Sequence, residues 1–228
     1  MCEVGVLLGR LADLAAGSRR RVPGTSDHMN EAVRELQAGE APTLFLIVGL
    51  PGSGKTVRAR ELAAERGALQ LTPDAWMLSL FGQEDRHQTR PDGKRWLLEG
   101  RLVALAIDVL RLGVSVVLDF GLWSRDERSA LRWIAGSVGA SCEVVYLPVE
   151  RHVQWSRIQA RWKNTPDQSF PMAEEELDGW KEGFEVPDAD ELSGSSVPSP
   201  PLGDASWFDW AQRFWPSLAQ SLNGPPVS

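Results

Sequence analysis

The sequence predicts a three-layer α/β domain built around a mostly parallel sheet, and three observations support this prediction. Residues 43–48 form an uninterrupted apolar run, which is typical of a strand buried on both faces of a parallel sheet. Short apolar runs then alternate with amphipathic helical patterns as far as residue 163. A glycine-rich turn joins the first apolar run to the first helical pattern, where α/β units place their ligand-binding loops.

Each predicted element has its own local signal along the chain. The apolar runs predict strands at residues 43–48, 69–71, 114–118 and 142–147. Helical periodicity with caps and closing glycines predicts helices at residues 30–38, 55–66, 94–112, 124–138 and 150–163. Thr72 followed by Pro73 predicts a further helix that begins directly after the second strand.

The composition sets broad limits on the function. Lys and Arg number 24 and Asp and Glu number 31 among the 228 residues, so the formal net charge is −7. This balance argues against extensive coating of nucleic acid or of an anionic membrane. The longest apolar run, residues 44–50, is far shorter than the roughly 20 residues of a membrane helix. With two cysteines and no visible secretory signal, we expect a reducing, cytoplasmic location.

The glycine-rich turn at residues 49–56, Gly-Leu-Pro-Gly-Ser-Gly-Lys-Thr, satisfies the pattern G-x-x-x-x-G-K-[ST] in full. Its glycines allow successive N–H groups to point into one concavity, and the dipole of the following helix favours a bound phosphate. We therefore expect a bound nucleotide and assign ATP, although the loop itself does not distinguish ATP from GTP. The residues expected to hold it are Gly49, Pro51, Gly52, Ser53, Gly54, Lys55 and Thr56, with Arg125 as a further candidate.

Two positions are candidates for holding Mg²⁺. The Thr56 hydroxyl ends the loop, and Asp119 ends the predicted third strand, where a carboxylate can reach the ion through water. The alternative for Asp119 is an ordinary aspartate that begins a loop. No His or Cys cluster with metal-ligand spacing accompanies them.

Asp74, which follows the second strand, is a candidate general base. A carboxylate that faces the phosphate loop could take the proton of an acceptor hydroxyl. Asp74 would also suit the first turn of a helix that begins at Pro73, because an acid there complements the helix dipole. The two interpretations are compatible.

Several arginines and tryptophans are further candidates. Arg157 and Arg161 lie four residues apart on one helix face, from which they could neutralise charge that develops during phosphoryl transfer; the alternative is a solvated charged face. Arg125 and Arg128 could contact a phosphate or the acceptor. The tryptophans that could line a pocket, or equally belong to the core, are Trp76, Trp96 and Trp123.

These motifs together resemble the small P-loop kinases that include chloramphenicol phosphotransferase-like, zeta-toxin-like and polynucleotide-kinase-like proteins. The resemblance covers about residues 42–190 and implies a nucleoside-kinase-like P-loop NTPase fold with a helical lid. It also implies that Asp74 is the general base and that Arg157 and Arg161 stabilise the transferring group. Polynucleotide kinases place an Arg three residues after the base, whereas this chain has Met77. That difference weakens the case for a nucleic-acid acceptor.

We expect three parts along the chain: an N-terminal extension at residues 1–40, the kinase domain at 41–190, and a linker with a short aromatic segment at 191–228. Met29 is an alternative translation start. Residues 193–201 are rich in Pro and Ser, and the composition predicts no order of their own. The aromatic segment that follows, residues 207–222, is expected to dock onto its own domain, with partner binding as the alternative.

The sequence therefore predicts a catalytic set of Asp74, Lys55, Arg157 and Arg161 in an ATP- and Mg²⁺-dependent kinase. The predicted reaction transfers the γ-phosphoryl group to a hydroxyl of a small molecule. Two alternatives remain open: a 5′-hydroxyl polynucleotide kinase, and a non-catalytic ATP-binding regulatory module. Neither the acceptor nor the oligomeric state follows from the sequence.

Overall fold

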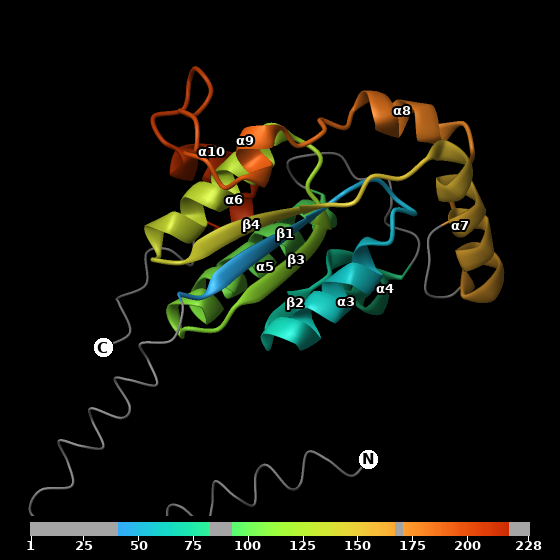
Figure 1. Ribbon diagram of the computed structural model, residues 1–228, viewed down its shortest axis with the longest axis horizontal. Helices are drawn as coiled ribbons and strands as arrows, with labels where there is room; N and C mark the ends of the chain where they lie inside the picture. The colour runs from blue at the N-terminus through green and yellow to red at the C-terminus, as the bar shows by residue number, and fades with distance from the viewer. Residues whose placement is uncertain (1–40, 83–92, 167–170, 219–228) are drawn as a thin grey trace, which may run out of the picture. The chain divides into compact units, whose positions relative to one another are not determined.

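The computed structural model describes residues 41–82, 93–166 and 171–218 (Figure 1). The helix expected at residues 30–38 and the start at Met29 lie outside this part of the chain. From Ala41 onward the described residues form one compact unit.

The strands in the described residues form one parallel sheet in the order β2-β3-β1-β4. Their bounds are Thr43–Val48 for β1, Leu69–Leu71 for β2, Val116–Gly121 for β3 and Ser141–Tyr146 for β4. The central strand β1 pairs with β3 on one side and with β4 on the other. Each of these strand pairings is parallel, as strands joined by helical crossovers should be. The predicted parallel sheet is therefore confirmed.

Helices cover both faces of the sheet. The longer helices are α3 (Lys55–Arg66), α4 (Pro73–Phe81), α5 (Lys94–Arg111), α6 (Arg125–Ser137) and α7 (Arg151–Asn164). The shorter elements that follow are α8 (Glu176–Glu182), α9 (Ala189–Leu192), α10 (Trp207–Phe214) and the 3-10 helix η2 (Pro216–Leu218). Figure 1 shows α3 on one face of the sheet and α5 and α6 on the other.

Alternate residues of β1 enter the two cores. Leu44, Leu46 and Val48 pack with α5 and α6, whereas Phe45 and Ile47 pack with α3. Side chains alternate across a strand, so a continuous apolar run is what a doubly covered strand requires. The three-layer α/β fold predicted from the sequence is therefore confirmed.

The third strand lies later in the chain than predicted. The sequence favoured residues 114–118, but β3 begins at Val116 and ends at Gly121. The N–H group of Val114 bonds back to Val109 in the turn that closes α5, and Val48 of β1 pairs with Gly121 beyond an irregularity in the register. Asp119 therefore lies within the strand instead of ending it.

The linker expected to lack order has anchored contacts in the structure. The indole N–H of Trp207 donates to the carbonyl of Pro198 at 2.7 Å, and Arg132 of α6 donates to the carbonyl of Ser195. Val197 packs against the larger core. The prediction that residues 193–201 lack order was therefore wrong. Their composition does not show the groups that anchor them, because those groups belong to other elements.

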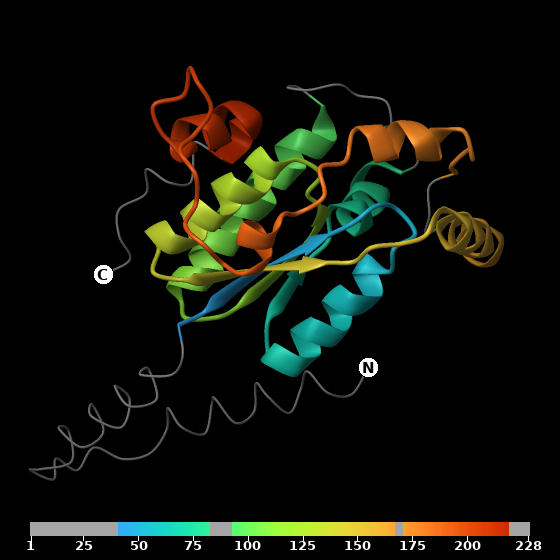
Figure 2. The same cartoon turned by 45° about the horizontal axis from the view of Figure 1, so that its top comes forward.

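The aromatic segment docks onto the domain, as expected. Figure 2 shows α10 beside α6, and the side chains of Trp215 and Leu218 are fully buried in the larger core. Among residues 41–82, 93–166 and 171–218, no helix combines the length and hydropathy that a membrane span would need.

Candidate active site

The glycine-rich loop turns between β1 and α3 in a conformation that depends on its glycines. Gly52 and Gly54 have φ values of 79° and 100°, in the left-handed region that other residues rarely adopt. A Cβ atom on Gly52 would lie 2.9 Å from the carbonyl oxygen of Gln154 in α7. The loop therefore packs tightly against α7 and leads directly into the N-terminus of α3.

Lys55 begins α3 at the end of this loop. Its ammonium group donates to the carbonyl of Leu50 at 2.9 Å and so folds back over the loop. Burial lowers the pKa of Lys55, while the carboxylates of Asp119 and Asp74 act in the opposite direction. The lysine thus lies within electrostatic reach of both predicted acids.

A cavity of about 1140 Å³ opens in front of the loop. Most of the predicted site residues line it: Pro51, Gly52, Gly54, Lys55, Thr56, Asp74, Asp119, Arg157 and Arg161. Gly49 and Ser53 do not line it but shape the loop from behind, since a Cβ atom on Gly49 would lie 2.7 Å from the Ser53 hydroxyl oxygen. The fold therefore brings residues from several distant segments to one place.

Thr56 and Asp119 form an oxygen-rich corner of the cavity. The Asp119 carboxylate accepts a hydrogen bond from the Thr56 hydroxyl and another from the Thr72 hydroxyl at 3.4 Å. Burial raises the pKa of Asp119, and these hydrogen bonds offset part of that effect. Thr72 precedes α4 as predicted, but its side chain does not cap the helix, because the hydroxyl is directed to Asp119.

This corner fits Mg²⁺ in the way that nucleotide enzymes bind it. Mg²⁺ prefers oxygen ligands and usually takes one or two protein groups together with substrate phosphates. Thr56 and Asp119 supply one hydroxyl and one carboxylate next to the phosphate loop. Within the described ranges, no three His, Cys, Asp or Glu side chains gather as a self-contained metal site would require.

Asp74 lies on the first turn of α4 and pairs with a residue that the sequence analysis missed. The Arg95 guanidinium of α5 lies 2.5 Å from an Asp74 carboxylate oxygen, and its Nε donates to Glu99 at 2.9 Å. Burial is the largest influence and raises the pKa of Asp74, but Arg95 together with Lys55 and Arg161 holds that pKa below the ordinary value. The i,i+4 spacing of Arg95 and Glu99 was visible in the sequence, whereas the partnership with Asp74 depends on how α4 packs on α5.

The two arginines predicted on α7 both reach the cavity. Arg157 donates from Nη1 to the carbonyls of Gly52 and Ser53, each at 3.3 Å, and Gln154 donates to the carbonyl of Pro51 at 2.9 Å. Arg161 lies one turn further along the helix and also lines the cavity. Figure 1 shows α7 standing beyond the sheet at the end where the phosphate loop lies.

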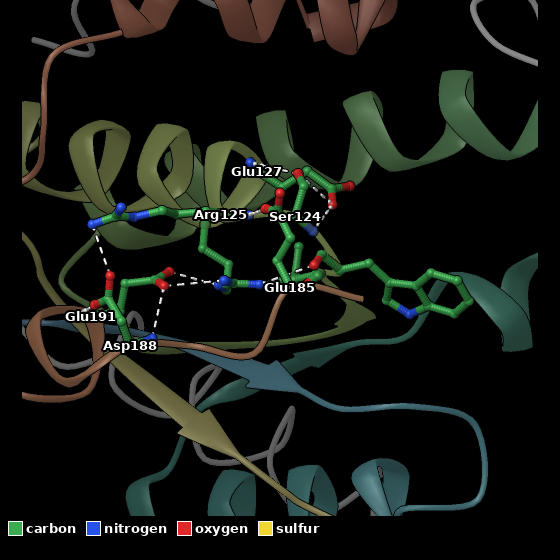
Figure 3. A network of polar contacts seen from close by, with 9 residues as sticks. Ser124, Arg125, Glu127, Glu185, Asp188 and Glu191 are labelled. Carbon is green, nitrogen blue, oxygen red and sulfur yellow. Dashed lines mark hydrogen bonds and ion pairs between the residues drawn. The ribbon is translucent and has the colours of Figure 1, made fainter. Parts of the chain in front are cut away.

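Arg125 is not brought to the cavity, contrary to expectation. Its guanidinium lies 2.8 Å from the Asp188 carboxylate, and its backbone N–H donates to Glu185 at 2.5 Å (Figure 3). The cause is the chain after α8, which returns alongside the start of α6 and supplies both acids. The Ser124 N-cap predicted for this helix is confirmed, with Glu127 completing a capping box.

Arg128 is likewise a structural residue. It is fully buried, and its guanidinium forms a two-pronged pair with Glu191 at 2.6 and 3.1 Å. It also donates to the carbonyls of Leu122 and Trp123, in a turn where Leu122 has a positive φ of 48°. Because Leu122 and Trp123 line the cavity, Arg128 supports the cavity wall from behind.

Aromatic side chains line much of the remaining wall. Trp96 and Trp123 face the cavity, as the sequence suggested, and Trp180 of α8 does so without having been predicted. Trp76 is 44% exposed and does not line the cavity. Asp74 and Trp76 therefore lie on different faces of α4, and only Asp74 lines the cavity.

With this geometry established, the chain can be compared with known proteins. Residues 44–187 match a family model described as an AAA domain. The chain belongs to this family. The match includes the phosphate loop and all of the sheet except Thr43, and it confirms the resemblance to small P-loop kinases and a nucleotide-binding fold. No curated protein matches the chain.

Several solved structures are similar to the chain at low identity. A gluconokinase from Sinorhizobium meliloti is 20% identical, with coverage of 81% of this chain and 96% of its own and a TM-score of 0.48. A sugar kinase from Janibacter sp. is 21% identical, with coverage of 82% and 100% and a TM-score of 0.49. Chaetomium thermophilum Kti12, solved with ADP-AlF3, is 16% identical, with coverage of 79% and 100% and a TM-score of 0.48. At these values the likenesses say nothing about the reaction of this chain.

Proposed function

We propose that this protein is an ATP-dependent kinase that transfers the γ-phosphoryl group to a hydroxyl of a small molecule. One observation carries the proposal: an ionised carboxylate, Asp74, lines the same cavity as the phosphate loop and interacts electrostatically with Lys55. A carboxylate at this place is what a general base for phosphoryl transfer requires. We call the loop, Thr56, Asp119 and the α7 arginines the phosphate side, and Asp74, Arg95 and Glu99 the acceptor side.

On the phosphate side, the loop amides and Lys55 would bind the β- and γ-phosphates of ATP. Thr56 and Asp119 would hold Mg²⁺, which when bound neutralises charge on the phosphate oxygens. Arg157 already contacts the loop, and Arg161 lies beside it on the same helix, so both are placed to stabilise negative charge on the transferring group.

On the acceptor side, Asp74 would accept the proton of the attacking hydroxyl. The hydroxyl oxygen forms the new bond to the γ-phosphorus while the bond from that phosphorus to the bridging oxygen of ADP breaks. Because the pKa of Asp74 is lowered, the carboxylate is ionised and ready to accept at neutral pH. Arg95 balances its charge before the reaction.

The size of the cavity supports a second ligand beside the nucleotide. Ligand pockets for one drug-sized molecule usually measure about 300–1,000 Å³, and this cavity exceeds that range at about 1140 Å³. Trp96 and Trp123 give the space next to the acceptor side an apolar, aromatic wall. This combination suits a small molecule with a hydroxyl group and a flat or apolar surface.

The test is ADP formation by the purified chain with ATP, Mg²⁺ and a panel of hydroxyl-bearing metabolites. One class of acceptor should raise ADP formation above the rate with ATP alone. Asp74→Asn should lower kcat by roughly 10²–10⁴-fold, the usual contribution of a general base, while calorimetry shows ATP affinity nearly unchanged. Asp108→Asn, on the exposed face of α5, is the matched control and should behave as wild type.

Two other outcomes would replace this proposal. Phosphorylation of 5′-hydroxyl oligonucleotides, with activity that falls steeply as salt rises, would indicate a polynucleotide kinase. ATP binding without turnover on any acceptor, unchanged by Asp74→Asn, would indicate a nucleotide-binding module.

A further inference from the structure

We infer that the C-terminal aromatic segment, residues 207–218, is a working part of the acceptor side: Trp215 acts as a positioning residue that holds Arg95 against Asp74 through Glu99. The inference rests on the proposed function, since it assigns these residues to the base of that reaction. The segment lies beyond residue 187, where the match to the AAA-domain family ends. The family model therefore does not account for it.

The first link joins the segment to α5. Trp215 is fully buried, and its indole N–H donates to Oε2 of Glu99 at 3.4 Å. Glu99 is only 4% exposed, so its charge has been taken largely out of water. A buried carboxylate is costly unless it is paired and hydrogen-bonded. The indole therefore contributes a hydrogen bond to this buried carboxylate.

The second link joins Glu99 to the base. The other carboxylate oxygen of Glu99, Oε1, accepts from Nε of Arg95 at 2.9 Å, and Nη1 of the same guanidinium reaches Asp74 at 2.5 Å. A guanidinium is planar, so fixing Nε sets the direction of Nη1. The position of Glu99 thus decides where Arg95 presents its charge to Asp74.

The segment packs so closely on α5 that the position of Trp215 constrains the position of Glu99. Ser217 donates its hydroxyl proton to the carbonyl of Leu97 at 2.6 Å, and a Cβ atom on Gly100 would lie 3.0 Å from that of Trp215. The ring of Trp215 is held at its other side by Phe214, with centroids 4.9 Å apart in an edge arrangement. Such contacts leave little freedom for the indole.

The simpler explanation is that the segment only covers apolar surface, and Trp210 provides the control for it. Trp210 is 5% exposed in the same aromatic cluster, and its ring stacks on Phe214 with centroids 4.3 Å apart. The indole that donates to Glu99, however, is that of Trp215. If only burial matters, Trp210→Phe and Trp215→Phe should have the same effect on activity.

The experiment compares both variants and Glu99→Gln with wild type in the full chain. Turnover is measured as ADP formed with the acceptor found in the panel and as phosphate released from ATP alone. Trp215→Phe and Glu99→Gln should lower kcat roughly ten-fold, within the loss of up to 10² that a misplacement of 1 Å can cause. The KM for ATP should stay within about two-fold of wild type, because these residues do not hold phosphate. Trp210→Phe should keep wild-type kcat, and melting temperatures show that each variant is folded.

The inference is overturned if folded Trp215→Phe and Glu99→Gln have wild-type kcat, or if Trp210→Phe loses as much activity as Trp215→Phe. If wild type forms no ADP with any acceptor, the proposed function fails separately. Hydrogen exchange then decides the positioning claim. Faster exchange in residues 94–100 of Trp215→Phe than of Trp210→Phe supports it, and equal exchange rejects it.

Discussion

The phosphate side of the cavity comes mainly from one continuous stretch, residues 49–56, whereas the acceptor side is assembled from residues far apart in the sequence. Asp74, Arg95, Glu99 and Trp215 come from α4, α5 and the residue that follows α10. The phosphate side depends on backbone N–H groups and a helix N-terminus, which a short motif can supply by itself. The acceptor side depends on side-chain pairs between helices, which exist only when the whole unit is packed. Changes on the two sides should therefore fail in different ways.

The largest expected effect is on the phosphate side. Lys55→Ala removes the ammonium group that binds the terminal phosphates, and we expect ADP formation to fall below detection. ATP affinity, measured by calorimetry, should fall as well, while the melting temperature changes little, because the Lys55 ammonium donates to a loop carbonyl of the same motif. Arg58→Ala, also on α3 but not among the residues that line the cavity, is the control. ATP binding equal to that of wild type in Lys55→Ala would contradict the role of the loop.

The next effect concerns the buried pair between Arg128, which supports the cavity wall, and Glu191, which lies beyond the family match. Glu191→Gln leaves the fully buried Arg128 without its counter-charge, and the free energy of unfolding should fall by about 3 kcal/mol, the lower end of the range for breaking a buried ion pair. Urea denaturation measures it. Asp190→Asn, an exposed neighbour in α9, should cost almost nothing. Equal losses in the two variants would show that the pair has no special role.

The smallest effect is a shift in pH dependence on the acceptor side. Arg95 is the main group that lowers the pKa of Asp74, so Arg95→Met should raise that pKa. In wild type the acid limb of kcat/KM should lie below the ordinary titration range of a carboxyl group, and in Arg95→Met it should move to higher pH. Arg111→Met, at the far end of α5, should leave the limb in place. An acid limb that does not move in Arg95→Met would show that Arg95 does not set the pKa of the base.

Prediction from sequence succeeded where the signal was local. Residues 43–48, 55–66 and 69–71 were predicted with the bounds that β1, α3 and β2 have, because an apolar run, a glycine motif and a closing glycine all act within a few residues. The N-cap at Ser124 was read from the same kind of signal, and the structure adds Glu127, which completes a capping box. The third strand was misplaced by a few residues, since its ends depend on pairing with β1.

Prediction was weakest for arginines. Arg125 was assigned to the nucleotide, but its guanidinium pairs with Asp188 and its backbone N–H donates to Glu185, both in a distant segment. Arg95 was overlooked although it contacts the proposed base. A long, flexible cationic side chain can reach many partners, and sequence spacing does not say which of them lies nearby.

The amino-acid sequence by itself determined the phosphate loop, the alternation of strands and helices and the doubly buried central strand, because each depends on backbone conformation and apolar periodicity over short distances. Only the tertiary structure decided which charges meet: Arg95 with Asp74 and Glu99, Arg128 with Glu191, and Trp215 with Glu99. Such pairs are strong only when buried in a defined geometry, and that geometry exists after distant segments have packed together.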